Sequence, residues 1–282
     1  MIRRFVSRSL LDKWTWGTGI ADFYSSIDRF VFRPKWLRSF LHGTWLGHAL
    51  HPVLTDLPIG ALTVALILDL LAIYDGANVA TLVGFIGLLL AAITGLGDLS
   101  ETDGKARQYG GVHASIMLIG AAFYVFSLVI RWGYAPGDPA QATIMAGVGY
   151  LFIVLGAYVG GELVFAFGNM VDRHAWRSGG TKWAALDVTE VPERQPTKAK
   201  AGAQSIVLVR VGDTIHALHD TCSHAGCSLS EGTLVGDTVQ CGCHGSRFKL
   251  ADGNVVVGPA TYDQPAYEVR RAEGKLEVRR LP

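Results

Sequence analysis

Two short segments near the C-terminus combine cysteine and histidine at spacings suited to metal binding. The first is a Cys-x-His segment, Cys222-Ser223-His224, and the second is a Cys-x-x-His segment, Cys241-Gly242-Cys243-His244. Together they offer two thiolates and two imidazoles, which are ligands of both structural zinc and iron–sulfur clusters. Zinc sites usually pair cysteine with cysteine and histidine with histidine, so the mixed segments favour an iron–sulfur cluster. Such a centre would move single electrons.

Residues 184–282 resemble Rieske [2Fe–2S] proteins through these two segments. The resemblance implies that Cys222 and Cys241 bind one iron and that His224 and His244 bind the other. Replacing two anionic thiolates by neutral imidazoles raises the reduction potential to about −150 to +300 mV, against about −400 mV for plant-type clusters. We therefore expect this domain to transfer single electrons.

The resemblance extends to residues around the expected cluster. It implies a disulfide between Cys227 and Cys243, and it matches Ser246 to a serine that donates a hydrogen bond to a bridging sulfide. Pro259 lies in a Gly-Pro-Ala segment similar to the loop that covers the cluster. Phe248 stands where many relatives have a tyrosine that donates to a cysteine sulfur. Because such donors stabilise the reduced cluster, we expect a potential below that of the highest-potential Rieske proteins.

The C-terminal segment has the pattern of a small antiparallel β domain. Its short apolar runs are bounded by Gly, Asp and Asn, and Gly212-Asp213 and Asp252-Gly253 are typical of hairpin turns. A sandwich or barrel that presents two loops at one end is predicted. The predicted strands include residues 206–209, 215–218, 255–257, 267–269 and 275–278.

The first two thirds of the chain have the composition of a membrane protein. Half of the 282 residues are hydrophobic and 17% are charged, which is more apolar than an average soluble domain. Four apolar stretches reach the length of about 20 residues that a helix needs to cross a bilayer. Short connections predict an all-α, up-down-up-down bundle. The predicted spans are residues 57–74, 79–99, 112–132 and 142–168.

We interpret the chain as a multi-domain membrane protein with four parts. Residues 1–45 are an amphipathic, aromatic-rich interfacial segment, residues 46–172 the transmembrane bundle, 173–183 a linker and 184–282 the Rieske-type domain. The motif His-Pro-x-Leu-x-x-Leu-Pro-x-Gly, beginning at His51, resembles the opening of an uncharacterised bacterial four-helix membrane family. That resemblance covers about residues 42–170 and implies no function.

Positive charge predicts the orientation in the cell membrane. Lysine and arginine concentrate in the N-terminal segment, the second-to-third loop and the segment after the last helix, whereas only Arg131 falls on the other side. The positive-inside rule then places the N-terminus and the Rieske domain in the cytoplasm. Arg3-Arg4 would also fit a twin-arginine export signal, but no apolar segment follows it. Cytosolic thiols are normally reduced, yet a buried bridge can resist reduction, so the disulfide is retained.

Polar residues of the predicted bundle leave three interpretations open. A haem b could be bound by two histidines, although it is not expected. A quinone headgroup could bind to a histidine and Glu162, whose position inside a span is a functional hint. Alternatively, these residues cap helices and anchor the interface. The candidates are His48, His51, His113, Glu162 and His174. Asp69 either faces an internal polar partner or lies near the far interface.

The favoured function is that of a membrane-anchored electron carrier that exchanges electrons with a redox protein, the quinone pool, or both. A redox sensor or assembly factor is the main alternative, and a haem-containing quinol oxidoreductase a further one. A Rieske oxygenase is not expected, because its mononuclear iron needs two histidines and a carboxylate, and the 38 residues after His244 contain no histidine. The net charge of +1 gives no sign of nucleic-acid binding. The oligomeric state stays open, as does whether the chain is an enzyme itself.

Overall fold

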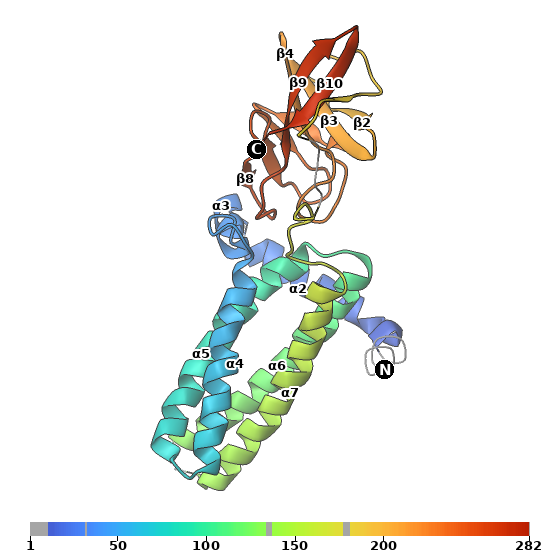
Figure 1. Cartoon of the computed structure of the whole chain (residues 1–282). Coiled ribbons are helices and arrows are strands. Elements are labelled where there is room, and N and C mark those ends of the chain that lie inside the picture. Colours follow the sequence, from blue (N-terminus) through green and yellow to red (C-terminus); the bar gives the residue numbers. More distant parts are fainter. Residues whose placement is uncertain (1–10, 32, 134–136, 177–180, 282) are drawn as a thin grey trace. The chain divides into compact units, whose positions relative to one another are not determined.

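The computed structural model describes residues 11–31, 33–133, 137–176 and 181–281 and separates into two compact units (Figure 1). The first unit comprises residues 1–33 and 50–169, and the second comprises residues 34–49 and 170–282. The Arg3-Arg4 pair and the Ser178-Gly179-Gly180 part of the predicted linker lie outside the described residues.

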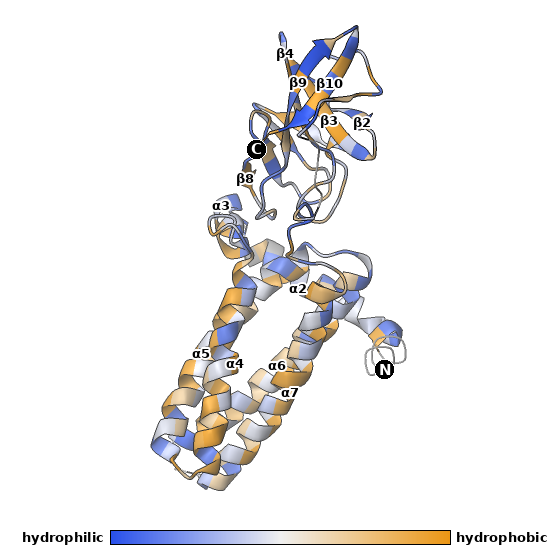
Figure 2. Cartoon of the chain, in the orientation of Figure 1, coloured by the Kyte–Doolittle hydropathy of each residue, from blue (hydrophilic) through white to orange (hydrophobic). Residues whose placement is uncertain are grey.

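Four long helices form most of the first unit. They are α4 (Leu50–Leu70), α5 (Tyr74–Ser100), α6 (Gly104–Trp132) and α7 (Pro139–Phe165). All four are long and apolar enough to cross a membrane, which confirms the four predicted spans, and hydrophobic residues run along each of them (Figure 2). Helix α4 starts seven residues before the first predicted span. Pro52 is compatible with this start, because in the first turn its missing N–H would have no intrahelical partner.

Small residues bring the helices of this bundle close together. Helix α4 packs along α5, α6 packs along α7, and the contacts of α5 with α6 and of α4 with α7 close the ring. A Cβ atom on Gly84 would lie 2.5 Å from the Leu62 side chain, and one on Gly149 would lie 3.1 Å from the Gly120 carbonyl oxygen. Glycine therefore permits the helix contacts that stabilise a bundle where lipid supplies little hydrophobic driving force.

A buried ion pair joins the helices near the end where α4 and α6 finish. The Arg131 guanidinium contacts both carboxylate oxygens of Asp69 and donates to the Asn78 side-chain oxygen at 2.7 Å and to the Ser127 hydroxyl at 3.1 Å. The Ser127 hydroxyl in turn donates to the Ala142 carbonyl at 2.8 Å. Asp69 therefore has an internal polar partner, and this network involves all four helices.

Two N-terminal helical segments also belong to the first unit. A short 3-10 turn, η2 (Leu11–Lys13), precedes α2 (Trp16–Val31), which packs on α6 and α5. A Cβ atom on Gly111 would lie 1.9 Å from the Gly17 carbonyl oxygen, so α2 and α6 cross at backbone contact. Exposed aromatic side chains on α2, such as Phe23 and Phe30, suit the interfacial position that the sequence predicts.

The second unit contains two antiparallel sheets. One has six strands in the order β1-β10-β9-β4-β3-β2, and the other has four in the order β5-β6-β7-β8. The six strands are β1 (Ala184–Ala185), β2 (Thr197–Ala201), β3 (Gln204–Val211), β4 (Thr214–His219), β9 (Ala266–Ala272) and β10 (Lys275–Arg280). The four strands are β5 (Thr233–Val235), β6 (Thr238–Gln240), β7 (Arg247–Lys249) and β8 (Val255–Val257).

This architecture confirms the predicted antiparallel β domain. Val211 pairs with Thr214, so Gly212-Asp213 is the two-residue turn of the β3–β4 hairpin, as predicted. Helix α3 (Lys35–His42) lies in the same unit and contacts β8. Strand β2, with its two lysines, and β5 to β7, with three residues each, gave no clear pattern in the sequence.

The buried ion pair allows a direct stability test. Replacement Arg131→Ala leaves the buried Asp69 carboxylate without its partner, and we expect the bundle to lose about 3–5 kcal/mol of unfolding free energy. Thermal unfolding of the full-length protein in detergent measures this loss. Lys105→Ala is the control, because Lys105 is 64% exposed in its ion pair with Asp12, and such pairs contribute about 0–1 kcal/mol. Equal effects of the two replacements would contradict the role of the network.

Candidate metal centre

Two loops at strand ends present the predicted metal ligands. The first loop, residues 222–227, follows β4, and an isolated bridge between Thr221 and Ser228 closes its base. The second loop, residues 241–246, connects β6 to β7, whose pairing of Gln240 with Arg247 closes its base. Both loops are therefore held at their two ends by antiparallel backbone pairing.

The two loops share one backbone conformation. In the first, the Cys222 N–H donates to the Cys227 carbonyl at 2.8 Å, and the Gly226 N–H donates to the Cys222 carbonyl at 3.0 Å. The second loop repeats both bonds at equivalent positions, at 2.8 and 3.1 Å. Gly226 and Gly245 have φ values of +89° and +80°, a region that glycine enters without steric cost. The spacing from cysteine to glycine thus sets the tight backbone turn of each loop, which we call its curl.

This curl directs backbone N–H groups at the cysteine sulfur atoms. The Cys222 sulfur accepts hydrogen bonds from the N–H groups of the second and third residues after it, and the Cys241 sulfur does the same in its own loop. Both side chains are almost fully buried, with exposed fractions of 1% and 2%, and neither is in a disulfide. N–H donors favour a negatively charged sulfur, which is the form that binds metal.

The two buried thiols lie in contact and share a proton. A hydrogen bond from Cys222, with those from the backbone, outweighs burial and lowers the pKa of Cys241. The same hydrogen bond, followed by burial and the nearby Cys241 charge, raises the pKa of Cys222. Cys241 is therefore the thiol that ionises first, and a cation between the sulfur atoms would stabilise the second thiolate.

The two histidines of the loops also lie side by side, and both are half-buried. The ring centroids of His224 and His244 are 4.9 Å apart, and their planes make an angle of 83°. Burial, followed by the charges of His244, His42 and Arg173, lowers the pKa of His224 to about 3. The His224 imidazole is therefore neutral at physiological pH, as a metal ligand must be.

The other two cysteines form a bridge between the loops. Cys227 and Cys243 are joined by a disulfide, with 6.5 Å between their Cα atoms, which confirms the predicted bond. The sulfur atoms of Cys227, Cys241 and Cys243 all lie within 4.8 Å of one another. Since the bridge removes two of these from coordination, the free sulfur ligands of the two loops are Cys222 and Cys241.

A third loop and the core cover the buried side of the site. The Ser246 side chain is fully buried, and its hydroxyl oxygen accepts a hydrogen bond from the Ala260 N–H at 3.0 Å. Pro259, which directly precedes Ala260, is buried as well. Phe248 is fully buried in the same core cluster as Cys222 and Cys241. The Ser246 hydroxyl hydrogen remains available to donate, while Phe248 offers only an apolar ring.

Two polar residues that the sequence analysis did not single out position the first loop. The Gln264 amide nitrogen donates to the carbonyl oxygens of His219 and Thr221, and its oxygen accepts from the Ser223 N–H at 3.0 Å. Gln264 is 1% exposed, so three backbone groups on both sides of Cys222 depend on one side chain. It lies 42 residues further along the chain than Cys222, and no local sequence pattern indicates this contact.

Asp220 is the second of these residues. Burial would raise the pKa of this carboxyl group, but hydrogen bonds from Ser228, Ser230 and Lys198 hold it below its usual value. The carboxylate accepts from the Ser228 hydroxyl and the Ser230 N–H, both at 2.8 Å. It therefore ties the start of the first loop to the segment that follows the loop.

Residues 34–49 also border the site, which the sequence did not indicate. The Ser39 hydroxyl accepts from the Gly258 N–H at 3.2 Å, and the Thr44 hydroxyl donates to the Ala260 carbonyl at 3.3 Å. His42 is 3% exposed and close enough to His224 to lower its pKa. The segment before the first membrane helix thus packs against the loop that contains Pro259.

The five polar candidates of the predicted bundle are divided between the two units. His174 lies beside the first loop, where its Nε2 atom contacts the Thr221 carbonyl at 2.9 Å and its ring lies 4.6 Å from that of His219. The next residue back, Arg173, donates to the His224 carbonyl at 3.0 Å. His48 also belongs to the second unit, whereas His51, His113 and Glu162 belong to the first.

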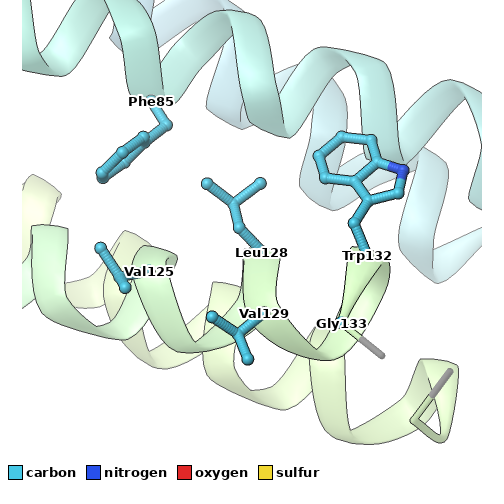
Figure 3. Close-up of a pocket in the computed structure, with 6 residues that line it drawn as sticks. All are labelled: Phe85, Val125, Leu128, Val129, Trp132 and Gly133. Atoms are coloured by element: carbon cyan, nitrogen blue, oxygen red, sulfur yellow. The ribbon is translucent and has the colours of Figure 1, made fainter. Parts of the chain in front are cut away.

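An apolar cavity of about 320 Å³ opens between α5 and α6 of the first unit (Figure 3). Figure 3 shows Phe85 of α5 directed towards Val125 of α6, with Trp132 near the end of α6. Its lining contains no titratable or metal-binding side chain. Its lining residues are Phe85, Val125, Leu128, Val129, Trp132 and Gly133.

Comparison with known proteins assigns a family to each part of the chain. Residues 181–268 match a family model described as "Rieske [2Fe-2S] domain", and residues 47–173 match one described as "Predicted membrane protein (DUF2231)". Both matches confirm the resemblances on which the sequence analysis relied.

Several ferredoxins are similar to part of this chain. Ferredoxin CarAc of Metapseudomonas resinovorans is 40% identical over 79 residues, which are 28% of this chain and 74% of that protein. The anthranilate 1,2-dioxygenase ferredoxin subunit of Burkholderia cepacia is 33% identical over 98 residues, which are 34% of this chain and 91% of that protein. A solved complex of oxygenase and ferredoxin in carbazole 1,9a-dioxygenase contains a chain 32% identical, at a TM-score of 0.32, covering 36% of this chain and 94% of that one.

Proposed function

Because this chain belongs to the Rieske [2Fe–2S] family and carries a DUF2231 membrane domain, we propose that it is a membrane-bound electron carrier. Its cofactor is a Rieske-type [2Fe–2S] cluster. The observation that carries the proposal is the convergence of two buried thiols and two half-buried imidazoles from two loops of one shape. When bound, the cluster accepts and releases one electron at a time.

We assign the cluster ligands residue by residue. Cys222 and Cys241 would hold one iron, and His224 and His244 the other. The residues present fit this set, because the sulfur atoms receive backbone N–H donors and the His224 imidazole is neutral. The sulfur ligands are buried, while the two imidazoles are closer to solvent, so electrons would enter and leave on the imidazole side.

Other residues of the chain adjust the electrostatics of the site. The Ser246 hydroxyl, whose oxygen already accepts from Ala260, would donate its hydrogen to the cluster and stabilise the extra electron. Phe248 contributes no such donor. Gln264 and the Cys227–Cys243 disulfide hold the loops in place, which keeps the ligand geometry the same in both redox states.

The partners follow from the relatives and from the membrane domain. The similar proteins include ferredoxin subunits of dioxygenases, so a redox protein that docks on the imidazole side is the proposed partner. The anchoring bundle keeps this carrier at the bilayer, where the quinone pool is the abundant membrane-soluble redox carrier. We propose that electrons pass between that pool and the redox protein. The lysine and arginine distribution supports a cytoplasmic Rieske domain.

Replacement of the ligands tests the assignment. Full-length protein reduced with dithionite in detergent should show a Rieske-type paramagnetic signal, and Cys222→Ser, Cys241→Ser, His224→Ala and His244→Ala should each abolish it. The control is His216→Ala, a half-buried histidine of β4, which should keep the signal. A wild-type protein that contains zinc and no paramagnetic centre would refute the proposal, and a signal that survives a ligand replacement would refute that assignment.

The reduction potential tests the roles of Ser246 and Phe248. Hydrogen bonds to charged groups contribute about 1.5–3 kcal/mol, and 1.4 kcal/mol corresponds to about 59 mV for one electron. Ser246→Ala should therefore lower the midpoint potential by roughly 60–120 mV, and Phe248→Tyr should raise it by adding a donor. Thr197→Ala is the control, because that exposed hydroxyl of β2 donates to the Gln195 carbonyl at 3.1 Å. Redox titration followed by paramagnetic resonance gives the values, and an unchanged potential in Ser246→Ala would exclude the proposed donor.

Inverted membrane vesicles test the orientation and the quinone link together. Protease added outside these vesicles should release the Rieske domain, because their outer face is the former cytoplasmic face. In separate vesicles that receive no protease, added quinol should reduce the wild-type cluster, as observed by its paramagnetic signal. Vesicles with His224→Ala, which should lack the cluster, give the background. Protection of the Rieske domain from the protease would indicate the opposite orientation in the membrane. Protein that is reduced by dithionite but not by quinol would exclude the quinone link and leave the redox protein as the partner.

A further inference from the structure

Two histidines face each other across the transmembrane bundle, and we propose that they are the axial ligands of a haem. His51 lies at the start of α4, and His113 lies nine residues after the start of α6. Their ring centroids are 6.4 Å apart, and the ring planes make an angle of 78°. Since α4 contacts α5 and α7, and α6 contacts the same two helices, the histidines come from diagonally opposite helices and meet in the bundle interior.

Each ring is oriented by the helix that follows its own. The His51 Nδ1 atom lies 2.8 Å from the Ala91 carbonyl oxygen of α5, and the His113 Nδ1 atom lies 2.8 Å from the Gly156 carbonyl oxygen of α7. A carbonyl can only accept, so both Nδ1 atoms carry the proton and both Nε2 atoms keep a lone pair. Histidine ligands of metals show this arrangement, with the second ring nitrogen donating to a carbonyl or carboxylate.

Among the residues that the structure describes, neither Nε2 atom has a hydrogen-bond partner. Within the described part of the chain, the polar contacts of these rings are the two carbonyl bonds and the approach of one ring to the other. Both histidines are partly buried, and polar atoms inside a membrane bundle are ordinarily paired because water is scarce there. The two open lone pairs on neighbouring rings are therefore available to a ligand that binds both.

The surroundings of the two rings repeat between the two helical hairpins. In each hairpin a glycine follows the acceptor carbonyl by four residues, Gly95 after Ala91 and Gly160 after Gly156. A Cβ atom on Gly95 would lie 2.8 Å from the His51 ring, and one on Gly160 would lie 3.1 Å from the His113 ring. Each histidine thus rests on a glycine of the next helix. This duplication is what a two-sided site requires, and helix capping alone does not require it.

An iron porphyrin fits this pair better than a bare metal ion does. Zinc and similar ions need about four protein ligands, yet in the described part of the chain the only cluster of three or more metal-binding side chains is in the cysteine loops. A porphyrin supplies four nitrogen ligands itself and needs one or two axial ligands, commonly histidine. When both Nε2 atoms point at one iron, two metal–nitrogen bonds of about 2.0 Å and the radii of the two imidazole rings add up along one line. Their sum is close to the 6.4 Å between the ring centroids.

A quinone headgroup fits these two atoms less well. The oxygen atoms of an oxidised quinone need hydrogen-bond donors, whereas both Nδ1–H groups are already used and both Nε2 atoms are acceptors. The hydroxyl groups of a quinol could donate to these acceptors, so a test of this site must also detect bound quinone or quinol. Helical bundles commonly build cofactor sites from side chains on facing helices. The structure therefore assigns the bundle a b-type haem, in addition to the iron–sulfur cluster of the other unit.

Optical spectra of the full-length protein test this site independently of the cluster. Protein produced with a haem precursor and purified in detergent should contain about one haem per chain by pyridine haemochrome assay, with the sharp reduced α band of six-coordinate b-type haem. His51→Ala and His113→Ala should each lose most of the bound haem, and the double variant all of it. The Rieske-type paramagnetic signal should persist in every variant, which separates failure here from failure of the proposed electron carrier.

Two controls distinguish ligation from folding. His48→Ala, three residues before His51, should keep the haem, because His48 belongs to the second unit and its Nδ1 atom lies 3.2 Å from the neighbouring Ala49 carbonyl. Haem titrated into each purified variant should give a Soret shift that saturates at one equivalent in wild type and His48→Ala but not in the other two, with helical circular dichroism unchanged. Absence of haem in wild type after both treatments, or full haem retention in both ligand variants, would overturn the proposal. Bound quinone that depends on His51 and His113 would do so as well.

Discussion

A cluster divided between two loops exists only while both loops keep their own shape and their mutual distance. Much of the second unit serves that requirement. The same curl occurs twice, fixed by a glycine four residues after each cysteine, and it directs N–H groups at each sulfur. The disulfide then fixes one loop to the other, and Gln264 fixes the first loop to the strand that follows the proline loop. Strand pairing fixes the ends of both loops, while polar side chains fix the positions of the loops relative to their surroundings.

The membrane unit obeys the opposite constraint, because each polar atom in its interior must find a partner inside the bundle. At one end of the bundle, Arg131 pairs with Asp69 and also donates to the neutral side chains of Asn78 and Ser127. Towards the other end, His51 and His113 satisfy one nitrogen each through a backbone carbonyl. In the first arrangement the guanidinium donates to three side chains, and both oxygen atoms of the Asp69 carboxylate accept from it. The second is half-complete, and this difference distinguishes a structural contact from a site for a ligand.

The sequence predicted the elements whose signals are local. Long apolar runs gave the four helices, and the Cys-x-His and Cys-x-x-His segments gave the cluster loops, because a metal ligand set is a matter of residue type and spacing. It did not predict Gln264, Asp220 or the packing of residues 34–49 on the proline loop, since these contacts join distant parts of the chain. For the same reason the sequence could not show which of the five polar candidates lie near the cluster loops and which lie inside the bundle. His51 and His113 lie 62 residues apart, and only the folded hairpins show that they meet while His174 lies beside the cluster loop.

The disulfide and the proposed cytoplasmic orientation are compatible when the loop geometry is considered. Glutathione and thioredoxin keep most cytosolic thiols reduced. Here the two loops are already closed by backbone hydrogen bonds and held by strand pairing and Gln264, so Cys227 and Cys243 would stay adjacent after reduction. Nearby thiols have a high effective concentration, which lowers the reduction potential of their disulfide. The interactions that position the cluster ligands therefore also favour the bridge, and its persistence is a consequence of the site that it helps to close.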